Sequence, residues 1–173
     1  FYAQRLLASG IEFDMVFGPA YKGIPLGAAV AIELARRGRN VPFAYNRKEA
    51  KDHGEGGSLI GRAPADGDRV VLIDDVVTAG ASVRESVALL RAAARVRLAG
   101  LLVSVDRQER GAGERSALRE LRDEFGLEAF AIVTLEEIVR HLRGRPIDGQ
   151  VVLDDALLQQ IDAYRARYGA AEG

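Results

Sequence analysis

The feature that most constrains the fold is an alternation of short apolar runs with helix-like segments. The apolar runs have the length of buried strands and lie at 13–17, 41–45, 69–73, 98–105 and 128–133. Helical patterns lie at 24–37, 82–94, 115–125, 134–142 and 154–167, and residues 1–10 resemble a helix that ends at Gly10. This alternation is typical of βαβ units, so it predicts an α/β fold with a twisted, mainly parallel sheet flanked by helices.

Composition removes several classes of function. The 173 residues suit a single domain over 1–173. The chain has no cysteine, which excludes disulfides, thiolate nucleophiles and cysteine-bound metals. Its 24 basic and 25 acidic residues nearly cancel, which argues against a nucleic-acid partner. No apolar run approaches the ~20 residues of a membrane helix. We therefore expect a cytoplasmic protein with no membrane partner.

The most informative segment is VVLIDDVVTAGAS at 70–82. A strand that ends in Asp74 and Asp75 is followed by small residues that open a helix, which predicts a phosphate cradle at the carboxyl edge of the sheet. The two carboxylates would repel that phosphate unless they serve ribose hydroxyls or a magnesium ion. The plainer alternative is an aspartate helix cap, and we predict a cap for the similar VVLDDALL at 151–158, where no such loop follows.

A second candidate site is the polar stretch at 46–67, which contains five glycines. Long loops of this kind inside a compact domain are often functional, and we expect a flexible catalytic loop over about 46–60. Only three of the 24 basic residues are lysines, and two of them, Lys48 and Lys51, lie here with Arg47 and His53. Such cations could stabilise a polyanionic leaving group; a solvated run of surface charges is the alternative.

Four segments resemble type I phosphoribosyltransferases, and most closely the bacterial orotate phosphoribosyltransferases. The Asp-Asp and Thr-x-Gly pattern at 74–80 is similar to their motif for phosphoribosyl pyrophosphate (PRPP). The other three similar segments are FGPAYKGIP at 17–25, YNRKEAKDHGEGG at 45–57 and DRQERG at 106–111. The resemblance runs along nearly the whole chain, to the final YRARYG. The resemblance implies a type I phosphoribosyltransferase core, and a reaction of orotate with PRPP to give orotidine 5′-monophosphate and pyrophosphate in pyrimidine biosynthesis.

The same resemblance implies the site residues. Lys51, His53, Asp74 and Asp75 would be catalytic, and Thr78 and Arg107 would contact orotate. The residues that would bind PRPP are Tyr21, Lys22, Arg47, Lys48, Lys51, His53, Asp74, Asp75, Val76, Val77, Thr78, Ala79, Gly80, Ala81 and Ser82. The cofactor would be Mg²⁺, held mainly by PRPP. Family members are homodimers in which the loop at 47–53 reaches the neighbouring active site.

Two departures and several alternatives accompany this interpretation. Relatives carry an N-terminal hood segment over the base, which we expect to be missing here. The loop has Ser82 where relatives place a hydroxyl one residue earlier, which puts that phosphate contact in doubt.

On pattern alone, 19–23 could be an ordinary Pro–Gly turn and Arg107 could pair with Asp106 or Glu109. A phosphoribosyltransferase for another base, or a PRPP-binding regulator without catalysis, are the alternative functions.

Overall fold

The structure is a computed structural model that describes residues 1–48 and 58–170. Its main sheet has six strands in the order β3-β2-β1-β4-β5-β6. The strands β1, β2, β4, β5 and β6 run parallel, and β3 is antiparallel to β2. The strands are β1 (Met15–Gly18), β2 (Phe43–Asn46), β3 (Leu59–Gly61), β4 (Arg69–Ile73), β5 (Arg97–Asp106) and β6 (Glu128–Thr134). The mainly parallel α/β sheet predicted from the alternation is therefore confirmed.

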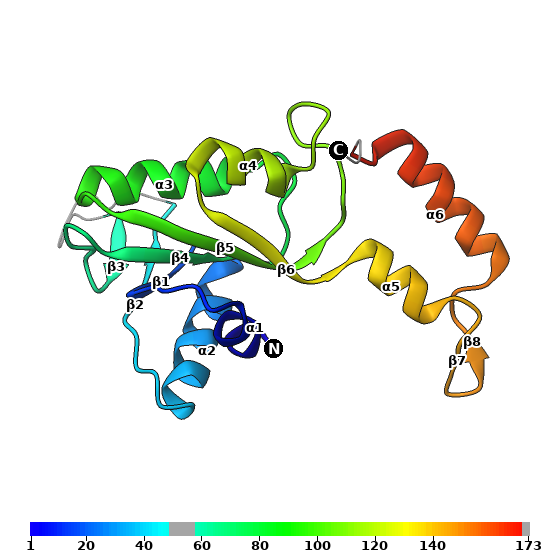
Figure 1. Ribbon diagram of the computed structural model, residues 1–173, viewed down its shortest axis with the longest axis horizontal. Helices are drawn as coiled ribbons and strands as arrows, with labels where there is room; N and C mark the ends of the chain where they lie inside the picture. Colours follow the sequence, from blue (N-terminus) through cyan, green and yellow to red (C-terminus); the bar gives the residue numbers. More distant parts are fainter. Residues whose placement is uncertain (49–57, 171–173) are drawn as a thin grey trace.

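Helices cover both faces of this sheet (Figure 1). One face carries α1 (Tyr2–Ser9) and α2 (Gly23–Arg36), and the other carries α3 (Ala81–Ala93) and α4 (Ala117–Phe125). The strand residues alternate between two apolar clusters: Val70 and Leu72 pack on the α3 side, whereas Val71 and Ile73 pack on the α1 side. Because both faces are buried, the central strands are continuous apolar runs, as is usual for parallel sheets.

Three helix ends follow from local chemistry. Gly10 ends α1 in the left-handed region, with φ of 70°, where glycine has no steric penalty. Thr134 and Glu137 form a capping box at the start of α5 (Leu135–Leu142). Asp154 accepts a hydrogen bond from the backbone N–H of Leu157 at the start of α6 (Asp155–Tyr168). The prediction that the aspartates at 154–155 serve a cap, unlike those at 74–75, is confirmed at Asp154.

The boundaries of the expected loop at 46–60 were wrong. Asn46 belongs to β2, and Leu59 and Ile60 belong to β3, which pairs with β2 through Asn46↔Leu59 and Tyr45↔Ile60. Leu59 also packs against the core. The run Leu59–Gly61 has only three residues and follows a polar, glycine-rich stretch. It is too short to indicate a strand from the sequence. Residues 49–57 lie outside the described residues.

The C-terminal part of the chain extends beyond the end of the sheet (Figure 1). It comprises α5, a short hairpin of β7 (Pro146–Ile147) and β8 (Gln150–Val151), and α6. After α6 the chain returns to the connection that follows β5, where Glu109 and Gly169 form an antiparallel bridge. Among the described residues, every helix is too short or too polar to cross a membrane.

Ion pairs link the segments at the amino edge of the parallel strands. Arg69, the first residue of β4, forms a bidentate pair with Asp14, which precedes β1, with N–O distances of 2.9 Å. Nearby, Arg62 pairs with Asp68 and Arg95 pairs with Asp66. We call these three pairs the amino-edge pairs. The hydrogen bonds from Arg69 lower the pKa of Asp14 to about 2.

We expect Asp14→Asn to reduce stability in a pH-dependent way. The pKa of Asp14 is lower in the folded protein than its usual 3.8, so its stabilisation is present above pH 4 and disappears as the pH falls towards 2. At pH 7 the variant should lose up to about 1 kcal/mol, the upper end for exposed pairs, because the fork is bidentate. Urea unfolding at pH 7, 4 and 2.5 would measure this, and the difference from wild type should shrink at the lowest pH.

Asp162→Asn is the matched control, because Asp162 is exposed on α6 and forms no ion pair in the described part of the chain. An Asp14→Asn variant that loses stability equally at all three pH values would contradict this explanation.

Candidate active site

Asp74 and Asp75 lie at the carboxyl end of β4, as predicted, but their environments differ. Asp74 is buried, with 7% of its surface exposed, and its Oδ1 accepts a hydrogen bond of 2.9 Å from the backbone N–H of Asp75. Burial raises the pKa of Asp74. For Asp75 burial acts in the same direction but is outweighed by the hydrogen bond and charge of Lys22, so its pKa is lowered. Asp75 is thus the more readily ionised member of the pair.

Lys22 brings a second segment to the same edge. Its Nζ lies 2.6 Å from Oδ2 of Asp75, although 53 residues separate them in sequence. The hydrogen bond to Asp75 raises the pKa of Lys22 in turn. The side chain of Lys22 remains 72% exposed and that of Asp75 28%. A cation and an anion therefore lie side by side at a solvent-accessible edge.

The segment that carries Lys22 runs from the end of β1 into α2. Two glycines allow the chain to turn closely: a Cβ on Gly18 would lie 2.0 Å from the carbonyl oxygen of Gly23. The backbone N–H of Ala20 donates to Oδ1 of the buried Asn46, at 2.8 Å. The next peptide bond, between Ala20 and Tyr21, is cis. The 18–23 segment is thus a packed turn, with the exposed side chains of Tyr21 and Lys22 on it.

Arg47 and Lys48 lie next to this turn. They line a hollow of about 270 Å³ with Tyr21 and Asn46, and Nζ of Lys48 lies 5.9 Å from the centre of the Tyr21 ring. Of the cations predicted to bind PRPP, the structure thus places Lys22, Arg47 and Lys48 around one turn. Lys51 and His53 lie outside the described residues.

The connection at 76–80 leads from the aspartates into α3. Thr78 and Ala79 are exposed, and Gly80 adopts a φ of 76° immediately before the helix. Within the described part of the chain, no side chain caps the N-terminus of α3, so its first backbone N–H groups have no side-chain acceptor there. Ser82, in the first turn, places its hydroxyl 3.5 Å from Oδ2 of Asp74. Uncapped N–H groups, with the helix dipole, suit an anion.

Long-range contacts that sequence reasoning missed fix the backbone of the aspartates. The Tyr2 hydroxyl lies 2.7 Å from the carbonyl oxygen of Asp74, to which it donates, and 2.6 Å from the Ser104 hydroxyl. The backbone N–H of Ser104 donates to the carbonyl of Asp75 at 2.8 Å. Tyr2 and Asp74 are 72 residues apart, and no local motif marks Tyr2 or Ser104; Asn46 lies in the motif at 45–57, but nothing there indicated its contact with Ala20. Only the strand order brings them to the site.

Arg107 follows β5 and lies in a different environment from the aspartates. Its Nη2 lies 2.8 Å from Oε2 of Glu109, so one of the two pairings that the sequence left open is present. Its Nε is buried and has no hydrogen-bond partner among the described residues. The surrounding hollow, of about 440 Å³, is lined by Leu135 of α5 and by Leu157, Ile161 and Tyr164 of α6.

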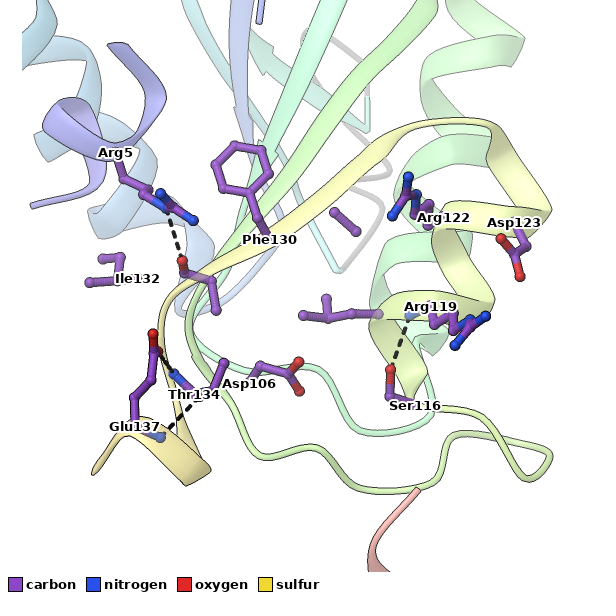
Figure 2. Close-up of a pocket in the computed structure, with 13 residues that line it drawn as sticks. Arg5, Asp106, Ser116, Arg119, Arg122, Asp123, Phe130, Ile132, Thr134 and Glu137 are labelled. Carbon is purple, nitrogen blue, oxygen red and sulfur yellow. Dashed lines mark hydrogen bonds between the residues drawn. The ribbon is translucent and has the colours of Figure 1, made fainter. Parts of the chain in front are cut away.

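A wider hollow of about 860 Å³ lies along β6, the edge strand of the sheet (Figure 2). Arg5 of α1 lies on one side and donates to the carbonyl oxygen of Ala131 at 3.2 Å; Arg119 and Arg122 of α4 lie on the other. Asp106 and Thr134, the last residues of β5 and β6, line its carboxyl end. This hollow was not predicted from the sequence.

Comparison with known proteins agrees with this geometry. Residues 1–127 match the family model of the phosphoribosyl transferase domain. An orotate phosphoribosyltransferase from Lachnoclostridium phytofermentans is 50% identical over 171 residues, which cover 98% of this chain and 76% of that protein. The chain belongs to the orotate phosphoribosyltransferase family.

Two further relatives give the same result. The orotate phosphoribosyltransferase from Chromobacterium violaceum is 54% identical over 169 residues, which cover 98% of this chain and 75% of that protein. The crystal structure of the Francisella tularensis orotate phosphoribosyltransferase superposes with a TM-score of 0.78 at 33% identity, covering 98% of this chain and 77% of that one. The family predicted from the four motifs is thus confirmed, as is the type I core. The chain spans about three quarters of the length of these relatives.

Proposed function

We propose that this protein transfers the phosphoribosyl group of PRPP to orotate, which yields orotidine 5′-monophosphate and pyrophosphate. The observation that carries the proposal is the Lys22–Asp75 pair, 2.6 Å apart at the carboxyl edge of β4. As the bond between C1 and the pyrophosphate oxygen breaks, the ribosyl group becomes cationic and the leaving group more anionic. A lysine and an aspartate at one edge can each stabilise one of these charges.

The ribose 5-phosphate part of PRPP would lie between the aspartates and α3. Asp75, which is anionic and partly exposed, would face the ribose hydroxyls and the cationic sugar, with Asp74 beside it. Residues 76–82 would bind the 5′-phosphate through backbone N–H groups at the uncapped start of α3. Ser82 is within reach of Asp74, so its hydroxyl would bind the phosphate only after it turns away from that carboxylate.

Pyrophosphate would lie on the 18–23 turn. Tyr21, Lys22 and Arg47, which lie on or beside this turn, would bind it from the same protomer. In a homodimer, Lys48, Lys51 and His53 would serve the neighbouring site. Closure of these cations over the leaving group would also exclude water, which would otherwise hydrolyse the ribosyl cation.

Magnesium would be held mainly by PRPP. In residues 1–48 and 58–170, no group of three or more histidine or acidic side chains could hold a metal ion. The Asp74–Asp75 pair suits an ion that takes most of its ligands from phosphate oxygens and water. When bound, the ion neutralises part of the pyrophosphate charge.

Orotate would be recognised through its carboxylate. Arg107 is the proposed partner, because a guanidinium and a carboxylate form a bidentate fork, and its Nε has no acceptor among the described residues. Thr78, exposed in the loop before α3, would contact the base from the other side.

We expect the protein to consume PRPP far faster with orotate than with uracil, adenine or hypoxanthine. The reason is that only orotate carries the carboxylate that pairs with Arg107, and a site built to bind such a group commonly rejects analogues that lack it by about 10⁴-fold or more. A coupled assay for pyrophosphate release with each acceptor would measure this. Equal rates with hypoxanthine would indicate a purine enzyme, and binding of PRPP without turnover of any base would indicate a regulator.

A further inference from the structure

A chain of polar contacts connects Arg107 to the C-terminal helix. Nη2 of Arg107 lies 2.8 Å from Oε2 of Glu109. The other carboxylate oxygen of Glu109, Oε1, accepts a hydrogen bond of 2.7 Å from the hydroxyl of Tyr164 on α6. Glu109 is largely buried, with 17% of its side chain exposed. Each of its two oxygens therefore has one defined partner.

Backbone hydrogen bonds fix the same part of the chain from both sides. The N–H of Arg110 donates to the carbonyl of Tyr168 at 2.9 Å, and the N–H of Ala170 donates to the carbonyl of Gln108 at 2.9 Å. On the other side, the N–H of Glu136, in the first turn of α5, donates to the side-chain oxygen of Gln108 at 3.0 Å. The connection that carries Arg107 is thus bound to the start of α5 and to the end of α6.

The arrangement leaves part of the guanidinium for a ligand. Arginine has five N–H donors in a rigid plane; the ion pair with Glu109 is made through Nη2, and Nε has no hydrogen-bond partner among the described residues. An arginine side chain has several rotatable bonds, so an unrestrained one loses conformational entropy when it binds a substrate. A buried carboxylate that is itself oriented by a phenol removes much of that freedom before the substrate arrives.

We propose that Tyr164 and Glu109 are positioning residues that orient Arg107 towards the carboxylate of the base substrate, so that α6 contributes to substrate selection. The inference rests on the proposed function, because it takes Arg107 as the residue that binds orotate. Tyr164 acts on Arg107 through Glu109 and does not touch the substrate itself. Loss of the Tyr164 hydroxyl therefore weakens the binding of orotate. It leaves unchanged the binding of PRPP, which binds at the ends of β1 and β4.

The test compares Tyr164→Phe with Tyr168→Phe. The two rings pack together, with centroids 4.7 Å apart, but only the Tyr164 hydroxyl forms a hydrogen bond in the described part of the chain. Tyr164→Phe should raise the KM for orotate about two- to tenfold, the value of one hydrogen bond, with the KM for PRPP unchanged. Tyr168→Phe should change neither KM.

A merely structural role would raise both KM values, and that result would overturn the proposal. Glu109→Gln, which keeps the shape but removes the charge, should raise the orotate KM at least as much as Tyr164→Phe. A third measurement separates this proposal from the proposed function. In an Arg107→Lys background, which lacks the planar fork, Tyr164→Phe should have no further effect on the orotate kcat/KM.

If Tyr164→Phe lowers the orotate kcat/KM by the same factor in the Arg107→Lys background as in the wild type, Tyr164 does not act through Arg107. If Arg107→Lys itself leaves the orotate kcat/KM at the wild-type value, it is the assignment of Arg107 to orotate that fails.

Discussion

Replacing Lys51 by alanine should lower kcat by about a hundredfold to a thousandfold, the usual cost of losing one donor to a developing negative charge. The pyrophosphate of bound PRPP is already partly shielded by water and counter-ions. Additional charge appears on the leaving oxygen only as the bond to C1 breaks, so a lysine that meets it acts mainly on the transition state. The Kd for PRPP should therefore change far less than kcat. Steady-state kinetics with orotate and equilibrium binding of PRPP would measure the two effects separately.

Lys51→Arg is the informative companion, because it keeps the charge. We expect only partial recovery, since a planar fork replaces a compact ammonium. A wild-type kcat in Lys51→Ala would show that Lys51 has no catalytic role. Equal losses in kcat/KM and in PRPP affinity, with kcat retained, would show that it contributes only to ground-state binding.

The same variant tests whether the loop serves the neighbouring subunit. If it does, a mixture of Lys51→Ala and Asp75→Asn subunits should regain activity, because one of the two sites in each heterodimer combines an intact loop with an intact aspartate pair. Activity would be measured against mixing ratio after subunit exchange. Verified heterodimers that stay inactive would reject a shared site.

Gly18→Ala should damage both stability and PRPP binding. The new Cβ would lie 2.0 Å from the carbonyl oxygen and 2.6 Å from the carbonyl carbon of Gly23. Backbone atoms cannot rotate away as a side chain can, and Gly23 is itself packed against the carbonyl of Ile73. The turn must therefore shift, which moves Lys22 away from Asp75. We expect a loss of about 1–3 kcal/mol or more in the free energy of unfolding, and at least about a tenfold rise in the KM for PRPP, equal to about 1.4 kcal/mol.

Gly113→Ala is the matched control. Its Cβ would meet only the carboxylate of Glu120, at 3.1 Å, and that side chain can move. Urea unfolding and the KM for PRPP should both stay close to wild type. If Gly18→Ala behaves like Gly113→Ala, the close approach of β1 and α2 is not needed for PRPP binding.

Local signals in the sequence predicted most of the fold. The run VVLI before Asp74 is apolar because both faces of β4 are covered, and Gly10, Thr134 and Asp154 end or begin helices through contacts within a few residues. The three-residue strand β3 was missed, because its only support is pairing with β2 and burial of Leu59. These are tertiary contacts that periodicity does not report.

The sequence predicted the charged residues of the candidate site, but not the residues whose hydrogen bonds hold them in position. Asp75 was singled out as one of two adjacent carboxylates after a strand and Lys22 through the family resemblance, but their 2.6 Å contact depends on β1 and β4 being neighbours. Tyr2 resembles an ordinary helix residue in sequence, and Asn46 was assigned to the expected loop rather than to the end of β2. For Arg107, the sequence left Asp106 and Glu109 as possible partners, and the return of α6 to the connection after β5 explains why Glu109 is the one selected.

The amino-edge pairs lie at the opposite end of the strands from Lys22 and Asp75, and this separation has a consequence for protein engineering. Substitutions that raise thermal tolerance often reduce activity when they stiffen a catalytic region. At the amino edge, additional or stronger ion pairs around Asp14, Asp66 and Asp68 would stabilise the packing of β1, β3, β4 and β5. They would not contact the carboxyl edge, where Lys22 and Asp75 lie. Heat resistance and turnover can therefore be selected independently in this fold, one at each end of the same strands.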